Sequence, residues 1–235
     1  MKVACPVRLN PDQWAAYLDR TSRFKLVAGG VGSGKTTYGT VELPELVVGN
    51  FQLSRKSFDY AVVAPTYGTL HKVTLRRLKL RLGIDPTSDE VSRAARVLVR
   101  RVWKGERFVE LVTGDRIYWG SADREDTLDG PTLAGFWLDE ARYMSETAWR
   151  IMVARLRAEA PRLLGLLTTT PELGWLDQEF GPGKVGRATY HFRTALNAKH
   201  LDPQYIPQIL QTYSARDCRR LLDGEFVAST GLVYA

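Results

Sequence analysis

The residues from Gly29 to Thr36 (GGVGSGKT) have the pattern of a phosphate-binding loop. Glycines let consecutive backbone N–H groups curl around an anion, because no Cβ atom obstructs it. A lysine and a threonine that close such a loop can reach the β- and γ-phosphates and a Mg²⁺ ion, respectively. The candidate nucleotide-binding residues are therefore Gly29, Gly30, Val31, Gly32, Ser33, Gly34, Lys35, Thr36 and Thr37, with Lys35 also a candidate catalytic residue and Thr36 a candidate metal ligand.

An acidic pair, Asp139 and Glu140, follows the apolar run at residues 135–138 (GFWL). A carboxylate at the carboxyl end of a buried parallel strand lies close to the phosphate loop in a sheet of this kind. Asp139 is therefore predicted to hold Mg²⁺, mostly through water, and Glu140 to act as the general base for an attacking water. The pair favours nucleotide hydrolysis over kinase chemistry, because a kinase must keep water away from the γ-phosphate.

Two further residues are weaker candidates. Thr169 lies in a run of three threonines after the apolar stretch at 163–167, where a hydroxyl can touch the γ-phosphate or the lytic water and sense hydrolysis. The same run is also explained by the preference of threonine for strands. Gln13, which is 16 residues before the loop, can read adenine with its amide, or it can be an ordinary exposed helical glutamine.

The charge distribution favours an anionic partner. The net charge is +7, and 24 of the 33 basic residues are arginine, whose planar fork suits phosphate. Residues 71–107 contain eleven lysines and arginines against four acidic residues, so this segment equals the whole net charge. The segment predicts contact with nucleic acid, although a solvated helix face would explain it equally well.

Length and composition are those of a globular chain of one large domain, with or without a small appendage. The 235 residues are 44% hydrophobic and 25% charged. Two distant cysteines, Cys5 and Cys218, cannot build a disulfide framework. No apolar run approaches the ~18 residues that cross a bilayer, and no secretory signal is evident. We therefore expect a cytosolic protein without membrane association.

The elements that must position these residues alternate between strands and helices, which predicts an α/β fold with a mostly parallel sheet and flanking helices. Five tryptophans, at positions 14, 119, 137, 149 and 175, are predicted to fill its core. Strands are predicted at 24–28, 59–64, 108–112, 116–120, 135–138 and 163–167. Helices are predicted at 11–18, 35–48, 70–82, 90–103 and 145–158. A capping box at Thr87 and Glu90 is predicted to open the helix at 90–103.

The tail of the chain has a different character. From about Tyr190 a short strand precedes small helices around 203–213 and 216–222. We therefore predict two units, a nucleotide-binding core at 1–188 and a small C-terminal linker or lid subdomain at 189–235.

These motifs together resemble the ATPase half of the large terminases of tailed bacteriophages, the motors that pump DNA into a procapsid. The resemblance covers nearly the whole sequence. It includes the loop, the acidic strand at 136–141 (FWLDEA) and the threonines that end in Pro171. It is most specific in the tail, at 194–197 (TALN), 201–206 (LDPQYI), 222–226 (LDGEF) and 231–234 (GLVY).

The resemblance implies a P-loop NTPase fold of the ASCE type, with ATP and Mg²⁺ as cofactors. It implies ATP hydrolysis coupled to translocation of double-stranded DNA into a procapsid, in the cytoplasm of the infected host cell. The implied partners are double-stranded DNA, the portal protein, the small terminase subunit and further copies of the chain. Those copies would form a ring, a pentamer by resemblance, while the isolated chain would be a monomer.

Three positions depart from the family's pattern. Many relatives carry an arginine at the position of Val31, and often an Arg-Gly pair where this chain has Asp129-Gly130. The asparagine that usually precedes proline is Asn197, which Ala198 follows. The first two departures leave the arginine that neutralises the γ-phosphate unassigned.

We expect that arginine to come from a neighbouring subunit. The candidate is Arg124, in the loop at 121–130, with Arg142 as the second choice. The alternative for Arg124 is a surface ion pair with Glu125 or Asp126. The sequence ends where a nuclease domain would begin in such terminases, so we do not expect these residues to cut DNA.

Two other functions fit the same motifs. A helicase or repair-type DNA-dependent ATPase shares the loop and the acidic pair, but it would need a second sheet domain. A nucleotide-gated DNA-binding assembly module would use ATP as a switch with negligible turnover.

Overall fold

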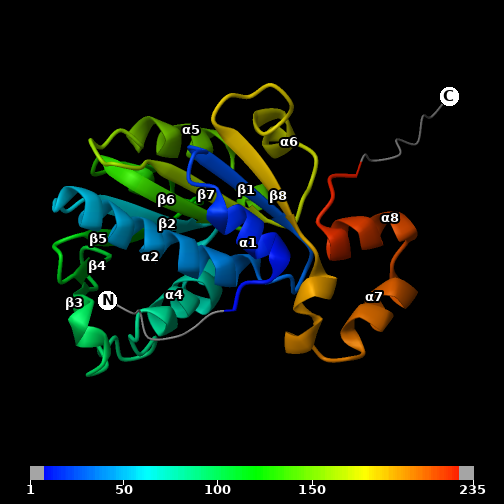
Figure 1. Ribbon diagram of the computed structural model, residues 1–235, viewed down its shortest axis with the longest axis horizontal. Coiled ribbons are helices and arrows are strands. Elements are labelled where there is room, and N and C mark those ends of the chain that lie inside the picture. The colour runs from blue at the N-terminus through cyan, green and yellow to red at the C-terminus, as the bar shows by residue number, and fades with distance from the viewer. Residues whose placement is uncertain (1–7, 228–235) are drawn as a thin grey trace.

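The computed structural model describes residues 8–227. Its centre is one eight-stranded sheet (Figure 1). The strand order is β3-β4-β5-β2-β6-β7-β1-β8. All pairs are parallel except β3 with β4 and β4 with β5. The strands are β1 (Phe24–Gly29), β2 (Asp59–Ala64), β3 (Val99–Trp103), β4 (Phe108–Leu111), β5 (Arg116–Ser121), β6 (Leu133–Asp139), β7 (Leu164–Thr169) and β8 (Arg187–Phe192). The predicted α/β fold with a mostly parallel sheet is confirmed.

Helices cover both faces of this sheet. The α-helices are α1 (Pro11–Leu18), α2 (Lys35–Ser54), α3 (Tyr67–Thr69), α4 (Leu75–Arg81), α5 (Glu146–Arg155), α6 (Trp175–Glu179), α7 (Tyr205–Thr212) and α8 (Ala215–Cys218). Shorter 3₁₀ or π turns are η1 (Leu70–Thr74), η2 (Ala95–Val97), η3 (Glu125–Leu128), η4 (Ala141–Tyr143), η5 (Thr194–His200) and η6 (Arg219–Asp223). Within residues 8–227, no helix has both the length and the apolar character needed to cross a membrane.

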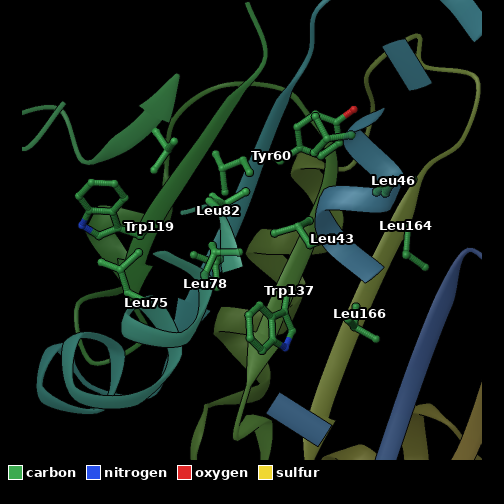
Figure 2. Packing of buried hydrophobic residues seen from close by; sticks show 14 of the residues in the cluster. Leu43, Leu46, Tyr60, Leu75, Leu78, Leu82, Trp119, Trp137, Leu164 and Leu166 are labelled. Atoms are coloured by element: carbon green, nitrogen blue, oxygen red, sulfur yellow. The ribbon is translucent and has the colours of Figure 1, made fainter. Parts of the chain in front are cut away.

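The core consists of two apolar layers, because successive side chains of a strand point to opposite faces. On one face, leucines of α2 and α4 form one apolar cluster with the buried rings of Trp137 and Trp119. Figure 2 shows Leu43 nearer to Trp137 and Leu75 beside Trp119. On the other face, Trp149 of α5 packs with Phe136 and its neighbours. Since β6 is buried on both faces, its polar end at Asp139 is held at a well-defined depth.

The register of the central strands gathers the candidate site at one edge of the sheet. Asp139 at the end of β6 lies opposite Thr168 of β7. Thr169 in turn lies opposite Ala28, just before the glycine-rich loop that leaves β1. The carboxyl ends of these three parallel strands therefore meet, as in other sheets of this type that bind ligands there.

The predicted helix at 90–103 is wrong. Its second half is the edge strand β3, which pairs antiparallel with β4, and the predicted capping box does not form. Thr87 N–H donates instead to Asp85 Oδ1 over 2.8 Å, in a turn. Trp103 Nε1 donates to Glu110 Oε2 of β4 over 3.0 Å. These cross-strand contacts, with β-branched valines at 99 and 102, outweigh the helix propensity of the arginines.

Two smaller expectations change as well. Trp119, Trp137 and Trp149 are buried, but Trp14 is 50% exposed and stacks on Tyr17, so its assignment to the core is wrong. Helix α2 extends beyond the predicted end at residue 48 to Ser54.

The tail begins inside the sheet. Strand β8 pairs parallel with β1, so the predicted boundary between residues 188 and 189 falls within this edge strand. The short helices η5, α7, α8 and η6 follow beyond it, at the right of Figure 1. The motif at 231–234 and Cys5 lie outside the described residues.

Candidate nucleotide-binding site

The glycine-rich loop joins β1 directly to α2. Gly34 caps α2 with φ of 89°, a left-handed conformation that favours glycine. The N–H of Tyr38 makes the first bond of the helix, to Gly34 O over 2.9 Å. The N–H groups of the preceding residues, Lys35 to Thr37, therefore have no partner within the helix, as at any helix start. Such a helix start attracts a phosphate through its N–H groups and dipole.

Lys35 lies beneath this loop. Its Nζ donates to Gly30 O over 3.1 Å, and the side chain is almost entirely buried. Burial lowers the pKa of Lys35, while the carboxylates of Glu140 and Asp139 oppose that shift. The ammonium group therefore lies between the loop and the acidic pair, where a phosphate chain would pass.

Asp139 is the most connected residue of the site. Its Oδ1 accepts hydrogen bonds from the hydroxyls of Thr168 and Thr36, over 2.7 and 3.2 Å. Its Oδ2 accepts one from Thr74 over 2.7 Å. Burial raises the pKa of Asp139, and these three hydroxyls with Lys35 counter the shift. The carboxylate is thus held in place by three separate elements.

The predicted metal ligands fit Mg²⁺. This ion prefers oxygen ligands, and it keeps several waters while one or two protein groups and the phosphates complete its shell. Thr36 and Asp139 supply such oxygens side by side. Residues 8–227 contain no cluster of three or more His, Cys, Asp or Glu that could hold a metal alone. Nucleotide and water oxygens would therefore be needed as well.

Glu140 has an uncommon backbone conformation, with φ of 54° and ψ of 46°. A residue other than glycine in this left-handed region stores strain, which is typical of functional sites. Its Oε2 is buried and has no hydrogen-bond partner within the described chain. Burial raises the pKa of Glu140, which Lys35 partly offsets. A carboxylate with an unused acceptor and a raised pKa is suited to take a proton from water.

Arg142 and Thr169 complete this end of the site. Arg142 N–H donates to Thr169 Oγ1 over 3.1 Å, and Arg142 Nε lies 3.9 Å from Glu140 Oε2. The side chain of Arg142 is only 17% exposed and also approaches Glu172. Arg142 therefore contacts the acidic pair of its own chain, and Thr169 lies one residue after the threonine that bonds Asp139.

Arg124 and Gln13 lie farther from the acidic pair. Arg124 is 64% exposed, and its Nη2 is 3.8 Å from Asp126 Oδ2. Gln13 is buried rather than exposed: its amide accepts from Asn10 N–H and donates to Ser33 O over 3.4 Å. Gln13 thus supports the loop from α1, and its role toward adenine stays a prediction.

The C-terminal segment packs directly on the loop. Val31 N–H donates to Leu221 O over 2.7 Å, and Val31 O accepts from Thr194 Oγ1 over 2.9 Å. Asn197 Nδ2 donates to Gly32 O over 2.6 Å. The C-terminal turns η5 and η6 therefore form hydrogen bonds with backbone groups of the loop, although they are far from it in the sequence.

Sequence reasoning missed some of these contacts. Thr74 and Leu221 were not candidate site residues, because each acts through a partner far away in the sequence. Thr74 alone had a detectable signal. It is a polar residue on the buried face of the helix at 70–82, between Leu70 and Leu78.

Comparison with known proteins identifies the family of the chain. The family described as terminase large subunit, T4likevirus-type, N-terminal, matches residues 26–235. The chain belongs to this family. No relative is found among curated proteins.

Solved structures of terminases share the fold. The large terminase from a thermophilic bacteriophage is 18% identical with a TM-score of 0.72, over 97% of this chain and 56% of its own. The large terminase ATPase domain of Thermus phage P74-26 is 19% identical with a TM-score of 0.60, over 94% of each chain. The HK97 bacteriophage large terminase is 16% identical with a TM-score of 0.55, over 72% of this chain and 34% of its own. This terminase sequence therefore spans little more than half of the first of these proteins.

The packing of the tail on the loop generates a stability prediction. A Cβ atom on Gly30 would lie 2.6 Å from the carbonyl oxygens of Leu221 and Leu222 and would also press on Thr194. Backbone oxygens cannot move away easily, so Gly30→Ala should lower the free energy of unfolding by about 1–3 kcal/mol. Urea denaturation measures this change.

Gly49 provides the matched control. It lies within α2, and a Cβ there would meet nothing within 4 Å. Gly49→Ala should therefore raise the free energy of unfolding by about 0.5–1 kcal/mol, since alanine favours a helix. If Gly30→Ala were as stable as the parent protein, the close packing of the tail on the loop would be wrong.

Proposed function

We propose that this chain binds ATP with Mg²⁺ and hydrolyses it, and that the energy drives double-stranded DNA into a viral procapsid. The observation that carries the proposal is the cluster of Lys35, Thr36, Asp139 and Glu140 at one sheet edge, with Thr36 bonded to Asp139. Family membership supports the same conclusion. The large terminase from the thermophilic bacteriophage has been solved in complex with ADP and with ATP-gamma-S, which supports a nucleotide at this site.

Each residue of the cluster has a distinct role in the proposed reaction. Lys35 and the first N–H groups of α2 would hold the phosphates, and Gly29 to Gly34 would enclose them. Thr36 and Asp139 would hold Mg²⁺, which supplies positive charge to the phosphate oxygens. Glu140 would orient the attacking water and accept its proton. Thr169, beside the acidic strand, would sense the loss of the γ-phosphate.

The partners follow from the family. We propose that the chain acts with the portal protein and the small terminase subunit as one member of a homo-oligomeric ring, a pentamer by resemblance. Its place of action would be the cytoplasm of the infected host cell.

The role of Glu140 is tested by separating binding from turnover. Glu140→Gln keeps the size of the side chain but cannot accept a proton. It should bind Mg-ATP nearly as the parent does and lose roughly 10²-fold or more in kcat. Lys35→Ala should lose both nucleotide affinity and turnover, because it removes the charge that holds the phosphates. Phosphate release with and without DNA, together with nucleotide titration, measures both quantities.

Two outcomes would count against the proposal. Turnover by Glu140→Gln at the parental rate would contradict the assignment of the base. Tight ATP binding by the parent without phosphate release, even with DNA and assembled rings, would favour a nucleotide-gated module instead of a motor.

The basic residues of the segment at 71–107 lie on the helix formed by η1 and α4, on η2 and β3, and in the turns around them. Lys79 of α4 is buried and pairs with Asp89, with 2.5 Å between Nζ and Oδ1, so it is not available to a partner. Along and before β3, Arg96, Arg100 and Arg101 are exposed and line a hollow, although Arg100 pairs with Glu110 over 3.0 Å. The charge therefore does not form one solvated helix face, and we propose that the β3 edge contacts DNA phosphates.

Charge reversal at this edge tests the DNA contact. Phosphate contacts release counterions, so log K falls with log salt by about 0.9 per contact. The double variant Arg96→Glu, Arg101→Glu should lower that slope by roughly 2. The double variant Arg150→Glu, Arg157→Glu changes the net charge equally in the region of α5 and serves as the control. If the two double variants had equal slopes of log K against log salt in duplex binding, the proposed contact of the β3 edge with DNA would be wrong.

Arg124 remains our proposal for an arginine that enters a neighbouring active site. An arginine at the γ-phosphate is worth roughly 10³–10⁵ in rate. Arg124→Ala retains its own nucleotide pocket, and Lys35→Ala retains Arg124. If Arg124 acts in trans, mixing these two inactive proteins should restore part of the ATPase activity in assembled rings. No recovery, with mixed assembly verified independently, would remove Arg124 from this role.

A further inference from the structure

The loop lacks one of its expected positive charges, because Val31 is apolar and 40% exposed. Lys35 and Mg²⁺ would leave part of the charge of a triphosphate uncompensated. A second cation within the same chain would therefore have to come from another element that reaches the start of α2.

Helix α4 provides such an element. Residues 67–81 form one continuous helix through α3, η1 and α4. Thr74, which bonds Asp139, and Arg77 are three residues apart, so they lie on the same face of this helix. Helix α4 contacts α2, and the contact of Arg77 with Thr37 lies at the beginning of α2. The bond from Thr74 to Asp139 thus sets the position from which Arg77 extends.

Arg77 reaches the nucleotide side of α2. Its Nη1 lies 3.5 Å from Thr37 Oγ1, in the first turn of that helix. Thr37 is two residues after Lys35 in the same helix start, so the guanidinium lies at the end of α2 where the loop joins it.

Arg77 is also available to a ligand. Its side chain is exposed, and it forms no ion pair with a carboxylate in the part of the chain that the structure describes. One hydroxyl at 3.5 Å occupies little of a group with five N–H donors. Arg142, by contrast, is held by Glu140 and Glu172. Phosphate oxygens are the acceptors that suit a free guanidinium best.

We propose that Arg77 binds a phosphate oxygen of the nucleotide held by the loop of its own chain, and so adds positive charge within the chain, separately from the arginine proposed to come from a neighbouring subunit. This inference rests on the proposed nucleotide site. It adds a residue that the loop and the acidic pair do not include.

Nucleotide binding tests the proposal, with Arg76 as the matched control. Arg76 is the preceding residue on the same helix, and it carries the same charge and is also exposed. Titration of Mg-ATP-gamma-S should show about 10-fold or greater weakening in Arg77→Ala, since a hydrogen bond to a charged group is lost. Arg77→Lys, which keeps the charge without the fork, should lose less, and Arg76→Ala should remain within about two-fold of the parent, as expected for a solvated charge.

Two further measurements complete the experiment. Thermal unfolding should be unchanged in all three variants, because both side chains are exposed. Titration of Mg-ADP locates the contact: weakening of both nucleotides assigns Arg77 to the α- or β-phosphate, and weakening of ATP-gamma-S alone assigns it to the γ-phosphate.

The outcomes that overturn the inference are distinct from those that overturn the function. Equal nucleotide affinity in Arg77→Ala and Arg76→Ala, with the parent binding well, would refute the role of Arg77 alone. A greater loss of duplex DNA affinity in Arg77→Ala than in Arg76→Ala, with unchanged nucleotide affinity, would make Arg77 a DNA ligand and refute it too. Failure of the parent protein to bind either nucleotide would refute the proposed function itself.

Discussion

The carboxylate of Asp139 is the group on which the geometry of the site depends. A buried carboxylate is costly unless its oxygens accept hydrogen bonds. Here the hydroxyls of Thr36, Thr74 and Thr168 donate to it, from α2, η1 and β7. Trp137 extends this hydrogen-bond network, because its Nε1 donates to Thr168 Oγ1 over 2.8 Å. The start of α2, the helix at residues 67–81 and the central sheet therefore share one anchoring group.

The same arrangement links the site to the rest of the molecule. Thr74 belongs to the helix that ends in α4, so the element that bears Arg77 is hydrogen-bonded directly to Asp139. On the opposite side of the loop, Leu221 and Asn197 hold its backbone groups. The loop therefore contacts the C-terminal segment directly, while the first turn of α2, which follows the loop, contacts Arg77.

Much of this arrangement was predictable because its signals are local. Gly29 to Thr36 form a contiguous motif whose glycines and helix start belong to adjacent residues. The buried strands before it and before Asp139 were recognisable as short apolar runs. The prediction of a helix at 90–103 was wrong because β3 is stabilised by partners in β4, such as Glu110. No local pattern at 99–103 reveals these partners.

The sequence alone determined the fold class and the positions of the glycine-rich loop and the acidic pair, because each depends on residues that are neighbours in the chain. Only the tertiary structure decided what surrounds them. It brought Thr74 to Asp139 across 65 positions and Asn197 to Gly32 across 165. It also placed Arg77 beside Thr37 and kept Arg124 on the surface. The physical reason is that a hydrogen bond or an ion pair acts over only a few ångströms, and packing of the two layers on the sheet determines which distant side chains come that close.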